Sequence, residues 1–551
     1  MAFKIGFLIN GSVVDKNNYE IIKWLSQEKN VELKCLLASD KLANNKYLFI
    51  KFGFAIRFVQ NLVISEILMK TVFAFEKLLL TKTERIWLKN FDVVSYFDEV
   101  YRINASKSFS ESCCDDAVIA INKIKNMKLD LIIRVGSNNI NSGVVELSKH
   151  GILSFSHGNN RIKRGGAPGF WEIINKCPET GFTIERLIAG KDYRDILYSG
   201  SFCTKRTWVK NYINVQIKAN HYMKNVINQF IKKGVFLSVQ KSYPYSMPLY
   251  KKPSAIIILL YLVNVVLHYS GRIFDRYLLN VDFIWHIAYQ ECKWSNLEMF
   301  NSKVIYPPKG TFLADPFAIN YLGCDYILAE EESYKNKRGH IVAYVIKDGE
   351  ALRLGKVLCE NFHLSYPYMF KYRDTIYMVP EASETRSVRL YSSITFPMEW
   401  KFEKVLLEDI SAVDATIFEK NGIWWMFVNI EPSEQNDHSS ELFAFSALDP
   451  INGTWVPHDL NPLIINPQNG RMGGILFEAD KIYRVSQSQG FMVYGQRSII
   501  HEIKELTQNS FREEALAVNY PLFLPGLIGT HHMHSTSTLT VFDFCKKKRI
   551  Y

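Results

Sequence analysis

The sequence predicts a multidomain protein with an α/β parallel-sheet domain, a basic helical linker and an all-β domain that forms a five-bladed β-propeller. The chain has 551 residues, more than one hydrophobic core usually serves. Strand-like and helical segments alternate in its first part, whereas short strands follow one another without long helices after about residue 285. A basic and apolar stretch separates the two patterns. We therefore place the domains at 1–203, 204–284 and 285–551.

The composition is that of a folded globular chain. Hydrophobic residues make up 48% and charged residues 22%, which excludes a disordered or collagen-like protein. The aromatic share of 14% favours strands and also suits sugar-binding surfaces. Nine scattered cysteines without a C-x-x-C pair exclude a disulfide framework, and the N-terminus lacks the features of a signal peptide. We expect a cytoplasmic protein.

The first domain shows β-α-β alternation, which is typical of a parallel sheet covered by helices. Apolar residues recurring among Lys and Arg between Asn44 and Leu88 predict an inserted amphipathic helix, which could face a membrane or form a buried helical pair. The segments with strand character are 3–10, 31–39, 129–136 and 151–156, and those with helix character are 17–29 and 143–149.

The linker carries the excess positive charge of the chain. From Ile196 to Phe274 it has eleven Lys and Arg residues and no acid, a pattern that attracts anionic surfaces. It lacks a nucleic-acid-binding motif, so we expect no nucleic acid partner. The apolar run Ala255–Leu267 is shorter than the roughly 20 residues of a spanning helix. It could lie in a membrane interface or be buried between domains, and we expect peripheral attachment to the inner face of the plasma membrane.

Residues 151–197 contain a strand ending at His157, an R-G-x-x-P-x-x-W element from Arg164 to Trp171, and a G-x-T-I strand followed by Asp192. This order resembles the core of the formyltransferase fold, and of a bacterial subgroup in which such a domain precedes a propeller. The resemblance implies that His157 is a general base and Asp192 its orienting carboxylate. It also implies a substrate-binding role for Asn159, Arg161, Arg164 and Trp171. Phe155 replaces the Asn of members that use a folate donor, so no cofactor is assigned.

The C-terminal part repeats a polar residue beside a short apolar strand about every 50 residues. Five such units of four strands predict a five-bladed propeller whose innermost strands share one central cavity. This arrangement would bring Asp315, His363, Asp414 and His531 close together. The repeats lie at Asp315, Pro367, Asp414, Met472 and His531.

The motifs ADPF, FHLSYPYMF, YMVPE and VDATIF resemble the propeller of family 43 glycoside hydrolases, and still more the N-terminal domain of plant glucosamine inositolphosphorylceramide transferases. The resemblance implies that Asp315 is a general base, Asp414 an orienting carboxylate and Glu381 an acid, with His363, Arg471 and His531 among the substrate-binding residues. Inverting hydrolysis would need two carboxyl groups roughly 6.5–9.5 Å apart. A cytoplasmic hydrolase would degrade its own product, which favours sugar binding or transfer.

Three histidines in the segment GTHHMHS suggest a metal site. On one strand His532 and His534 would share a face opposite His531, and no further ligand stands at a helical spacing. We therefore predict no metal.

Together these observations favour a transferase of cell-surface polysaccharide biosynthesis (O-antigen, capsule or exopolysaccharide). The first domain would transfer a formyl or related group to a sugar, and the propeller would bind the glycan. A glycosyltransferase with a nucleotide sugar and a lipid-linked acceptor, or a non-catalytic glycan-binding scaffold, are the alternatives. The expected partners are a sugar nucleotide or lipid-linked glycan and an anionic membrane surface.

Overall fold

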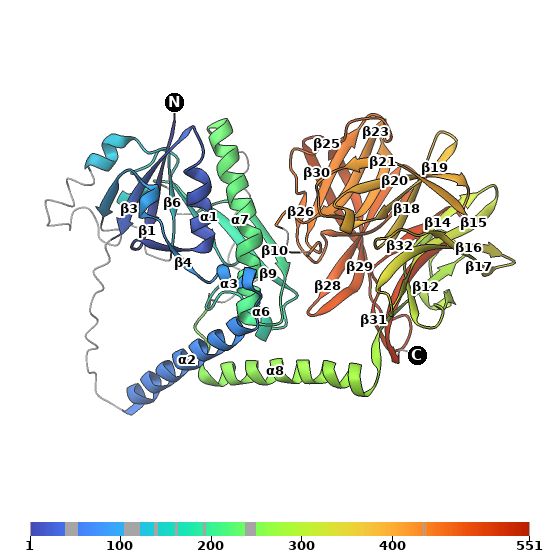
Figure 1. Ribbon diagram of the computed structural model, residues 1–551, viewed down its shortest axis with the longest axis horizontal. Coiled ribbons are helices and arrows are strands. Elements are labelled where there is room, and N and C mark those ends of the chain that lie inside the picture. Colours follow the sequence, from blue (N-terminus) through green and yellow to red (C-terminus); the bar gives the residue numbers. More distant parts are fainter. Residues whose placement is uncertain are drawn as a thin grey trace. The chain divides into compact units, whose positions relative to one another are not determined.

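The computed structural model describes residues 2–38, 53–103, 122–136, 142–159, 164–190, 194–236, 249–433, 435 and 437–549. The chain forms two compact units, Met1–Val265 and Val266–Tyr551 (Figure 1). The first unit is an α/β domain and the second contains the β-propeller. The boundary between them falls inside helix α8 (Ala255–Ile273).

A seven-stranded sheet in the order β10-β9-β7-β6-β1-β3-β5 forms the centre of the first unit. Five of its strands run parallel, as the alternating pattern predicts. β9 and β10 are antiparallel at one edge, so the prediction of a parallel sheet is wrong for this edge. The seven residues 188–194 between them are too few for a parallel crossover. The strands are β1 (Phe3–Ile9), β3 (Val31–Ala38), β5 (Val100–Ile103), β6 (Leu131–Arg134), β7 (Ile152–Ser156), β9 (Glu179–Leu187) and β10 (Asp195–Cys203).

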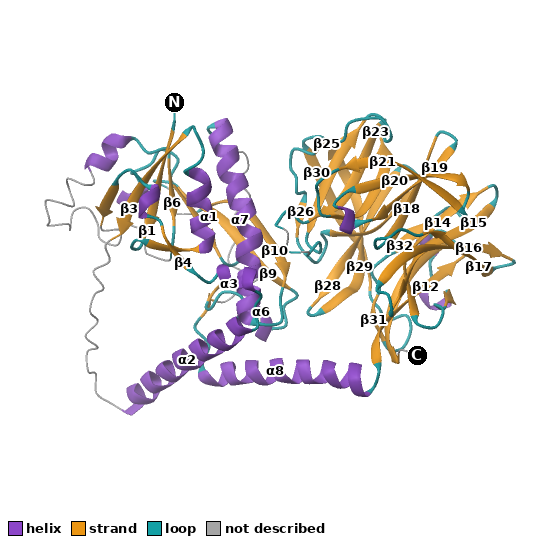
Figure 2. Cartoon of the chain, viewed as in Figure 1, coloured by secondary structure: helices purple, strands orange, loops and turns teal. Residues whose placement is uncertain are grey.

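Helix α7 (Trp208–Lys233) packs against β9, β10 and helix α1 (Lys16–Leu25), as Figure 2 shows. Residues such as Ile213, Tyr222 and Ile227 are fully buried there, and the helix ends at Gly234 in the left-handed conformation. The segment 204–284 is therefore not a separate linker, because α7 completes the core of the first unit. Basic residues of this segment are partly neutralised within the unit, since Lys210 pairs with Glu84 and Lys224 with Glu20.

Helices α2 (Gly53–Leu78) and α8 meet at a buried carboxyl group. Glu76 of α2 accepts hydrogen bonds from the Tyr261 hydroxyl of α8 and from the backbone N–H of Val209 at the start of α7. From Ala255 to Leu278 the chain forms one helix that is long and apolar enough to cross a membrane, with a mean hydropathy of 1.7. Its last turn, Phe274–Leu278, is a turn of π-helix.

The second unit contains five radially repeated sheets, which confirms the five-bladed propeller. Each of the first four blades takes its strands consecutively from the chain, and the repeated motifs noted in the sequence start their inner strands. The blades are β14 (Thr311–Tyr321), β15 (Cys324–Ser333), β16 (Arg338–Lys347) and β17 (Glu350–Leu358); β18 (Ser365–Tyr372), β19 (Thr375–Glu381), β20 (Val388–Thr395) and β21 (Glu399–Leu407); β22 (Ala412–Lys420), β23 (Ile423–Ile430), β24 (Glu441–Ala447), β25 (Val456–Pro457) and β26 (Ile464–Ile465); and β27 (Arg471–Glu478), β28 (Lys481–Gly490), β29 (Val493–Thr507) and β30 (Ser510–Asn519).

The fifth blade is built from both ends of the propeller segment. β12 (Val281–Gln290) pairs along its whole length with β33 (Thr540–Arg549). β13 (Lys303–Ile305) lies outside β12, whereas β31 (Leu527–Gly529) and β32 (Met533–Ser535) pair with β33 on the inner side. This pairing closes the ring of blades.

Candidate functional site

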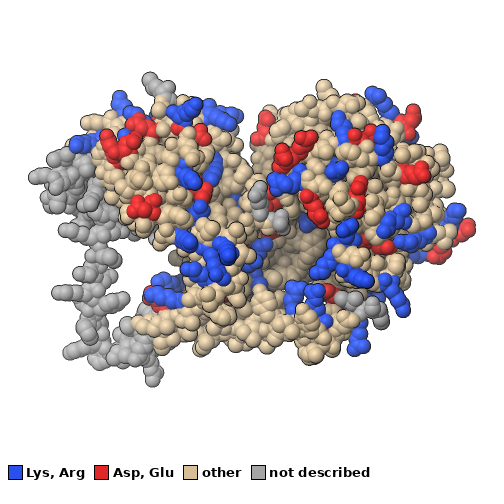
Figure 3. Space-filling model, viewed as in Figure 1, with Lys and Arg blue, Asp and Glu red and all other residues tan. Residues whose placement is uncertain are grey.

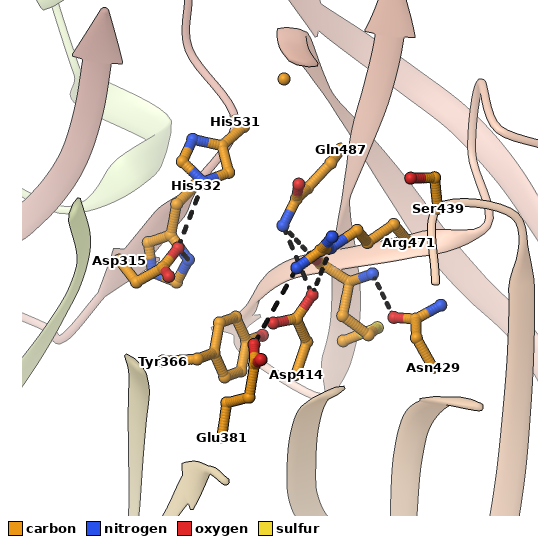
Figure 4. A network of polar contacts seen from close by, with 12 residues as sticks. Asp315, Tyr366, Glu381, Asp414, Asn429, Ser439, Arg471, Gln487, His531 and His532 are labelled. Carbon is orange, nitrogen blue, oxygen red and sulfur yellow. Dashed lines mark hydrogen bonds and ion pairs between the residues drawn. The ribbon is translucent and has the colours of Figure 1, made fainter. Parts of the chain in front are cut away.

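The inner strands of the first three blades carry the same backbone irregularity. A β-bulge interrupts the pairing of β14, β18 and β22 with their neighbours at equivalent positions. The bulge residues Asp315, Tyr366 and Asp414 have φ of 49°, 45° and 55°, which non-glycine residues rarely adopt. In the fourth blade the bulge contains Gly474, with φ of 124°. Bulges re-aim side chains, and these bring the three side chains to one polar network near the propeller axis (Figure 4).

Two acids share one arginine in this network. Arg471 Nε donates to Asp414 Oδ2 at 2.7 Å, and its Nη2 lies 4.0 Å from Glu381 Oε2. Asp414 is buried, whereas the side chains of Glu381 and Arg471 keep 12% and 15% of their exposure. The Arg471 guanidinium also lies over the Tyr494 ring. The network therefore reaches solvent through Glu381 and Arg471.

Burial shifts both acids toward the protonated form. It raises the pKa of Asp414 to about 7, although the Arg471 charge opposes this rise. Burial likewise raises the pKa of Glu381 against Arg471, and the neighbouring Asp315 raises it further. A carboxyl group whose pKa is raised in this way holds its proton more readily than an ordinary carboxyl group, which suits a proton donor.

A second group is centred on His531. Its Nε2 lies 3.3 Å from Asp315 Oδ1 and its Nδ1 lies 3.0 Å from Asp543 Oδ2. Asp543, on β33, also accepts the backbone N–H groups of His531, His532 and Asp315. Asp543 thus fixes the backbone of the first and fifth blades at the point where they meet.

His531 is a buried cation. Burial alone would lower its pKa, but the carboxylates of Asp543 and Asp315 outweigh burial and raise the pKa to about 10. Trp285 packs edge-on against the imidazole at a centroid distance of 4.1 Å. Asp315 therefore stands beside a fixed positive charge.

His363 was expected on an innermost strand of the propeller, but it lies in the segment before one. It precedes β18 instead of standing on an inner strand, and its Nε2 lies 3.4 Å from Glu330 Oε1. Its Nδ1 accepts the backbone N–H of Gly339 and lies 3.8 Å from Glu332 Oε2. His363 and Glu332 are more exposed than the other acids and bases of the site, at 23% and 21%. Burial and the charges of Asp315 and Glu332 raise the pKa of Glu330 well above its usual value.

Among the residues that the structure describes, two clusters have ligand atoms close enough to hold a cation: Asp315 with His531 and Asp543, and Glu330 with Glu332 and His363. A cation in the first cluster would have to displace the proton of His531. His532 and His534 belong to neither cluster. Both pack against the Phe317 ring, and His532 Nδ1 lies 3.8 Å from Asp315 Oδ1. Burial lowers the pKa of His532 to about 3 and that of His534 to about 4, so both imidazoles are neutral.

In the first unit, His157 lies just after β7, as the sequence predicts. Its imidazole stacks on Tyr212, meets the edge of Phe155 and lies 3.2 Å from the Gln216 amide nitrogen. Burial lowers its pKa to about 4, so it is a neutral acceptor. Its expected partner Asp192 lies outside the described residues.

The other residues expected around His157 divide into three cases. Arg161 also lies outside the described residues, whereas Asn159 follows two residues after His157 and Arg164 begins the short strand β8 (Arg164–Gly165). Trp171 is engaged by the protein itself, since its Nε1 donates to the Lys251 carbonyl and its ring stacks on Tyr250. The roles assigned to these residues stay predictions.

The residues of the propeller network that were not found from the sequence include Tyr366 and Asp543. Tyr366 is equivalent to Asp315, and the shared pattern of a polar residue, Pro and an aromatic residue in ADPF and SYPY could have identified it. Asp543 could have been noticed as a charged residue inside the apolar strand TVFDFC. Its contact with the first blade depends on ring closure, which no local pattern reveals.

Comparison with known proteins gives a match in the propeller. Residues 301–522 match the family model described as the N-terminal domain of glucosamine inositolphosphorylceramide transferase 1. The transferase of that name from Oryza sativa subsp. japonica is 32% identical over 213 residues, 38% of this chain and 28% of the relative. That of Arabidopsis thaliana is 35% identical over 207 residues, 37% of this chain and 27% of the relative. The chain spans less than a third of the length of these curated relatives.

Similar solved structures are distant. A family 117 glycoside hydrolase of Zobellia galactanivorans is 11% identical, with a TM-score of 0.31 over 48% of this chain and 91% of that chain. The arabinanase Arb43A of Bacillus subtilis is 12% identical, with a TM-score of 0.31 over 42% of this chain and 93% of that chain. The propeller assignment therefore rests on the strand order itself. In sequence, the propeller is similar to the N-terminal domain of the glucosamine inositolphosphorylceramide transferases.

Proposed function

We propose that this protein is a transferase that acts on carbohydrate and that the sugar binds at the polar network of the propeller. The observation that carries the proposal is the pairing of unlike acids there. Burial favours the protonated form of Glu381, whereas Asp315 lies beside the cationic His531. Two carboxyl groups in different environments are the usual means of acid and base catalysis at a glycosidic bond. The similarity to proteins named as glycolipid transferases favours transfer over hydrolysis.

The proposed reaction is a single displacement at the anomeric carbon of a donor sugar. Glu381 would give its proton to the leaving oxygen as the bond to the anomeric carbon breaks. Asp315 would take the proton of the acceptor hydroxyl as its oxygen bonds to that carbon. Arg471 would hold Glu381 and Asp414 in place, and Asp543 would hold His531 against Asp315. One displacement inverts the configuration of the anomeric carbon.

The test is transfer by the full chain. Nucleotide-activated sugars would be incubated with a detergent-solubilised polyprenyl-phosphate-linked sugar, and the acceptor mass and released nucleotide would be measured. Glu381→Gln and Asp315→Asn should each lower the rate at least about a hundredfold, as loss of a catalytic acid or base does. The exposed acids Glu419 and Asp480 supply the matched controls Glu419→Gln and Asp480→Asn, which should leave the rate unchanged. Free sugar without acceptor modification would identify a hydrolase instead, and glycan binding without turnover would identify a scaffold.

A second candidate is transfer of a formyl or related group by the first unit, as part of cell-surface polysaccharide biosynthesis. The observation that favours it is the neutral His157 at the carboxyl end of a parallel strand, where α/β sheets commonly bind ligands. His157→Ala should lower formylation of nucleotide-activated amino sugars by formyl-tetrahydrofolate at least about tenfold. An unchanged mass of every amino sugar with the wild-type protein would remove formyl transfer from a folate donor.

A further inference from the structure

Helix α8 presents an apolar face to solvent. Its buried residues Ile258 and Tyr261 lie on one side of the helix. On the other side, large aliphatic side chains recur three and four residues apart, and each is 51–70% exposed. This distribution is the reverse of an amphipathic helix packed on a soluble protein. The exposed residues are Ile256, Leu259, Leu260, Val263, Val266 and Leu267.

Helix α2 repeats the feature. It buries Ser65, Val72 and Glu76 against the first unit. Its outward side carries exposed apolar residues at both ends of its described part, with an exposed ion pair between Glu66 and Lys70. The exposed apolar residues of its described side chains are Val63, Ile64, Ile67, Phe75 and Leu78, and the exposed Leu79 follows the end of the helix. We call these residues and those of α8 the apolar helix face.

The two helices are fixed to one another and to the sheet domain. The Tyr261 hydroxyl donates to Glu76 and accepts the backbone N–H of Trp208 at 2.8 Å, while Glu76 accepts the backbone N–H of Val209. The Arg206 guanidinium donates to the Asn264 carbonyl of α8 at 2.7 Å. These contacts hold the first half of α8 lengthwise along the surface of the first unit.

Positive charge borders the apolar helix face. Lys251 and Lys252 are exposed and stand just ahead of α8, which begins at Ala255. Figure 3 shows mainly uncharged side chains along α2 and α8, with Lys and Arg beside them. Lys251 and Lys252 line a groove of about 890 Å³ beside α2, together with Met69, Phe73 and Trp208 and with the ion-paired Glu66 and Lys70. A groove with an apolar floor and lysines at its rim matches an acyl chain that ends in an anionic headgroup. Lys232 and Lys233, from the same basic segment, lie at the far end of α7.

We propose that the apolar helix face lies in the plane of a membrane that contains anionic lipid, with Lys251 and Lys252 at the headgroups. A spanning α8 is disfavoured because Ile258 and Tyr261 pack on protein, and because Arg206 binds near the middle of the helix. A guanidinium there would lie at the centre of the bilayer. The charge at the border favours lipid over a second copy of the chain, whose matching face would carry the same lysines.

The proposal is tested by sedimentation of the full chain with vesicles. The wild type should bind vesicles of phosphatidylcholine mixed with phosphatidylglycerol, and bind those of phosphatidylcholine alone more weakly. Lys251→Gln with Lys252→Gln should lower binding to the anionic vesicles roughly tenfold to thirtyfold, whereas Lys232→Gln with Lys233→Gln should change it less than about twofold. The two double variants remove the same charge from the same basic segment. Equal effects of both pairs would overturn the assignment of the surface.

The apolar contribution is tested in the same assay. Leu260→Glu with Val263→Glu should lower vesicle binding at least about tenfold. The exposed propeller leucines supply the control Leu448→Glu with Leu522→Glu, which should bind as the wild type does. Retention after alkaline carbonate washing would overturn the in-plane arrangement in favour of a spanning helix. If the wild type forms dimers and does not bind vesicles, and Leu260→Glu with Val263→Glu dissociates these dimers, the apolar helix face would be assigned to contact with a second copy of the chain. Because the detergent-solubilised acceptor of the transfer test does not require a membrane, failure here would leave the proposed transfer reaction standing.

Discussion

Asp315, Tyr366 and Asp414 occupy a backbone conformation that costs free energy for any residue other than glycine, of order 1–3 kcal/mol each. The fourth blade uses Gly474 at its bulge and avoids this cost. The polar network that these side chains form is therefore retained at the expense of stability. Such concentration of strain is typical of a site selected for chemistry. Sequence could place Asp315 and Asp414 on inner strands of the propeller, as the structure has them. It could not reveal Asp543, because the three backbone contacts of Asp543 join segments brought together only by the closed ring.

The first prediction concerns the acid that Arg471 holds. The pKa of Asp414 is about 7 in the folded protein, above its usual value of 3.8, so the unfolded chain loses this proton first as pH rises. The folded state of the wild type should therefore lose stability relative to Asp414→Asn between about pH 4 and pH 7, by on the order of 1–4 kcal/mol. Thermal unfolding of both proteins across this range measures the difference. If the stability of the wild type instead rises relative to that of Asp414→Asn as pH rises, the ion pair with Arg471 outweighs the effect of burial on Asp414.

The second prediction concerns the buried cation. His531 has a folded pKa of about 10 against an ordinary 6.5, so its stabilising contribution is complete below about pH 6.5 and is lost as pH rises through 10. Histidine NMR should show one imidazole that stays protonated at pH 8 in the wild type and titrates at a lower pH in Asp543→Asn. An Asp543→Asn spectrum with the same titration would show that Asp543 does not hold this charge.

At the scale of elements, the strands of the propeller and their five-fold repetition follow from the sequence, because period-two apolar segments and evenly spaced motifs are local signals. The parallel strands of the first unit were predictable for the same reason. The sequence could not show that α7 belongs to the first unit, because a basic amphipathic helix has the same sequence pattern whether it packs on a domain or stands in a linker. The sequence also left open whether α2 is buried or exposed. Apolar residues on its two sides look alike in the sequence and differ only in whether other segments of the chain cover them.

The third prediction tests how these helices are joined. Glu76 satisfies the Val209 N–H at the start of α7, where the cap residue Thr207 makes no side-chain hydrogen bond. Glu76→Ala should lower the free energy of unfolding of the first unit by about 1–3 kcal/mol, because a buried N–H and the Tyr261 hydroxyl lose their acceptor. Chemical denaturation followed by circular dichroism measures this loss. The exposed Glu66 on the same helix provides Glu66→Ala as the control, and equal effects of the two would rule out the capping role.

At the scale of the whole molecule, the chain has one α/β unit and one closed ring, each with its own core. The fourth prediction concerns closure of the ring. Phe542 is fully buried on β33, so Phe542→Asp should lower the stability of the propeller by about 3–5 kcal/mol and leave the first unit folded. Calorimetry should show one of two transitions shifted. Leu522→Asp, at an exposed propeller position, should move neither, and a shift of both transitions by Phe542→Asp would mean that the units unfold together.

Closure also sets the order in which the site can come into existence. β33 joins β12 only after the other four blades have been made, and Asp543 arrives on that last strand. Until then Asp315 has no cationic neighbour, because His531 lacks the carboxylate that fixes it. During synthesis, α8 leaves the ribosome long before β33 does. A growing chain would therefore reach the proposed membrane surface before Asp315, the proposed base, gains its cationic neighbour.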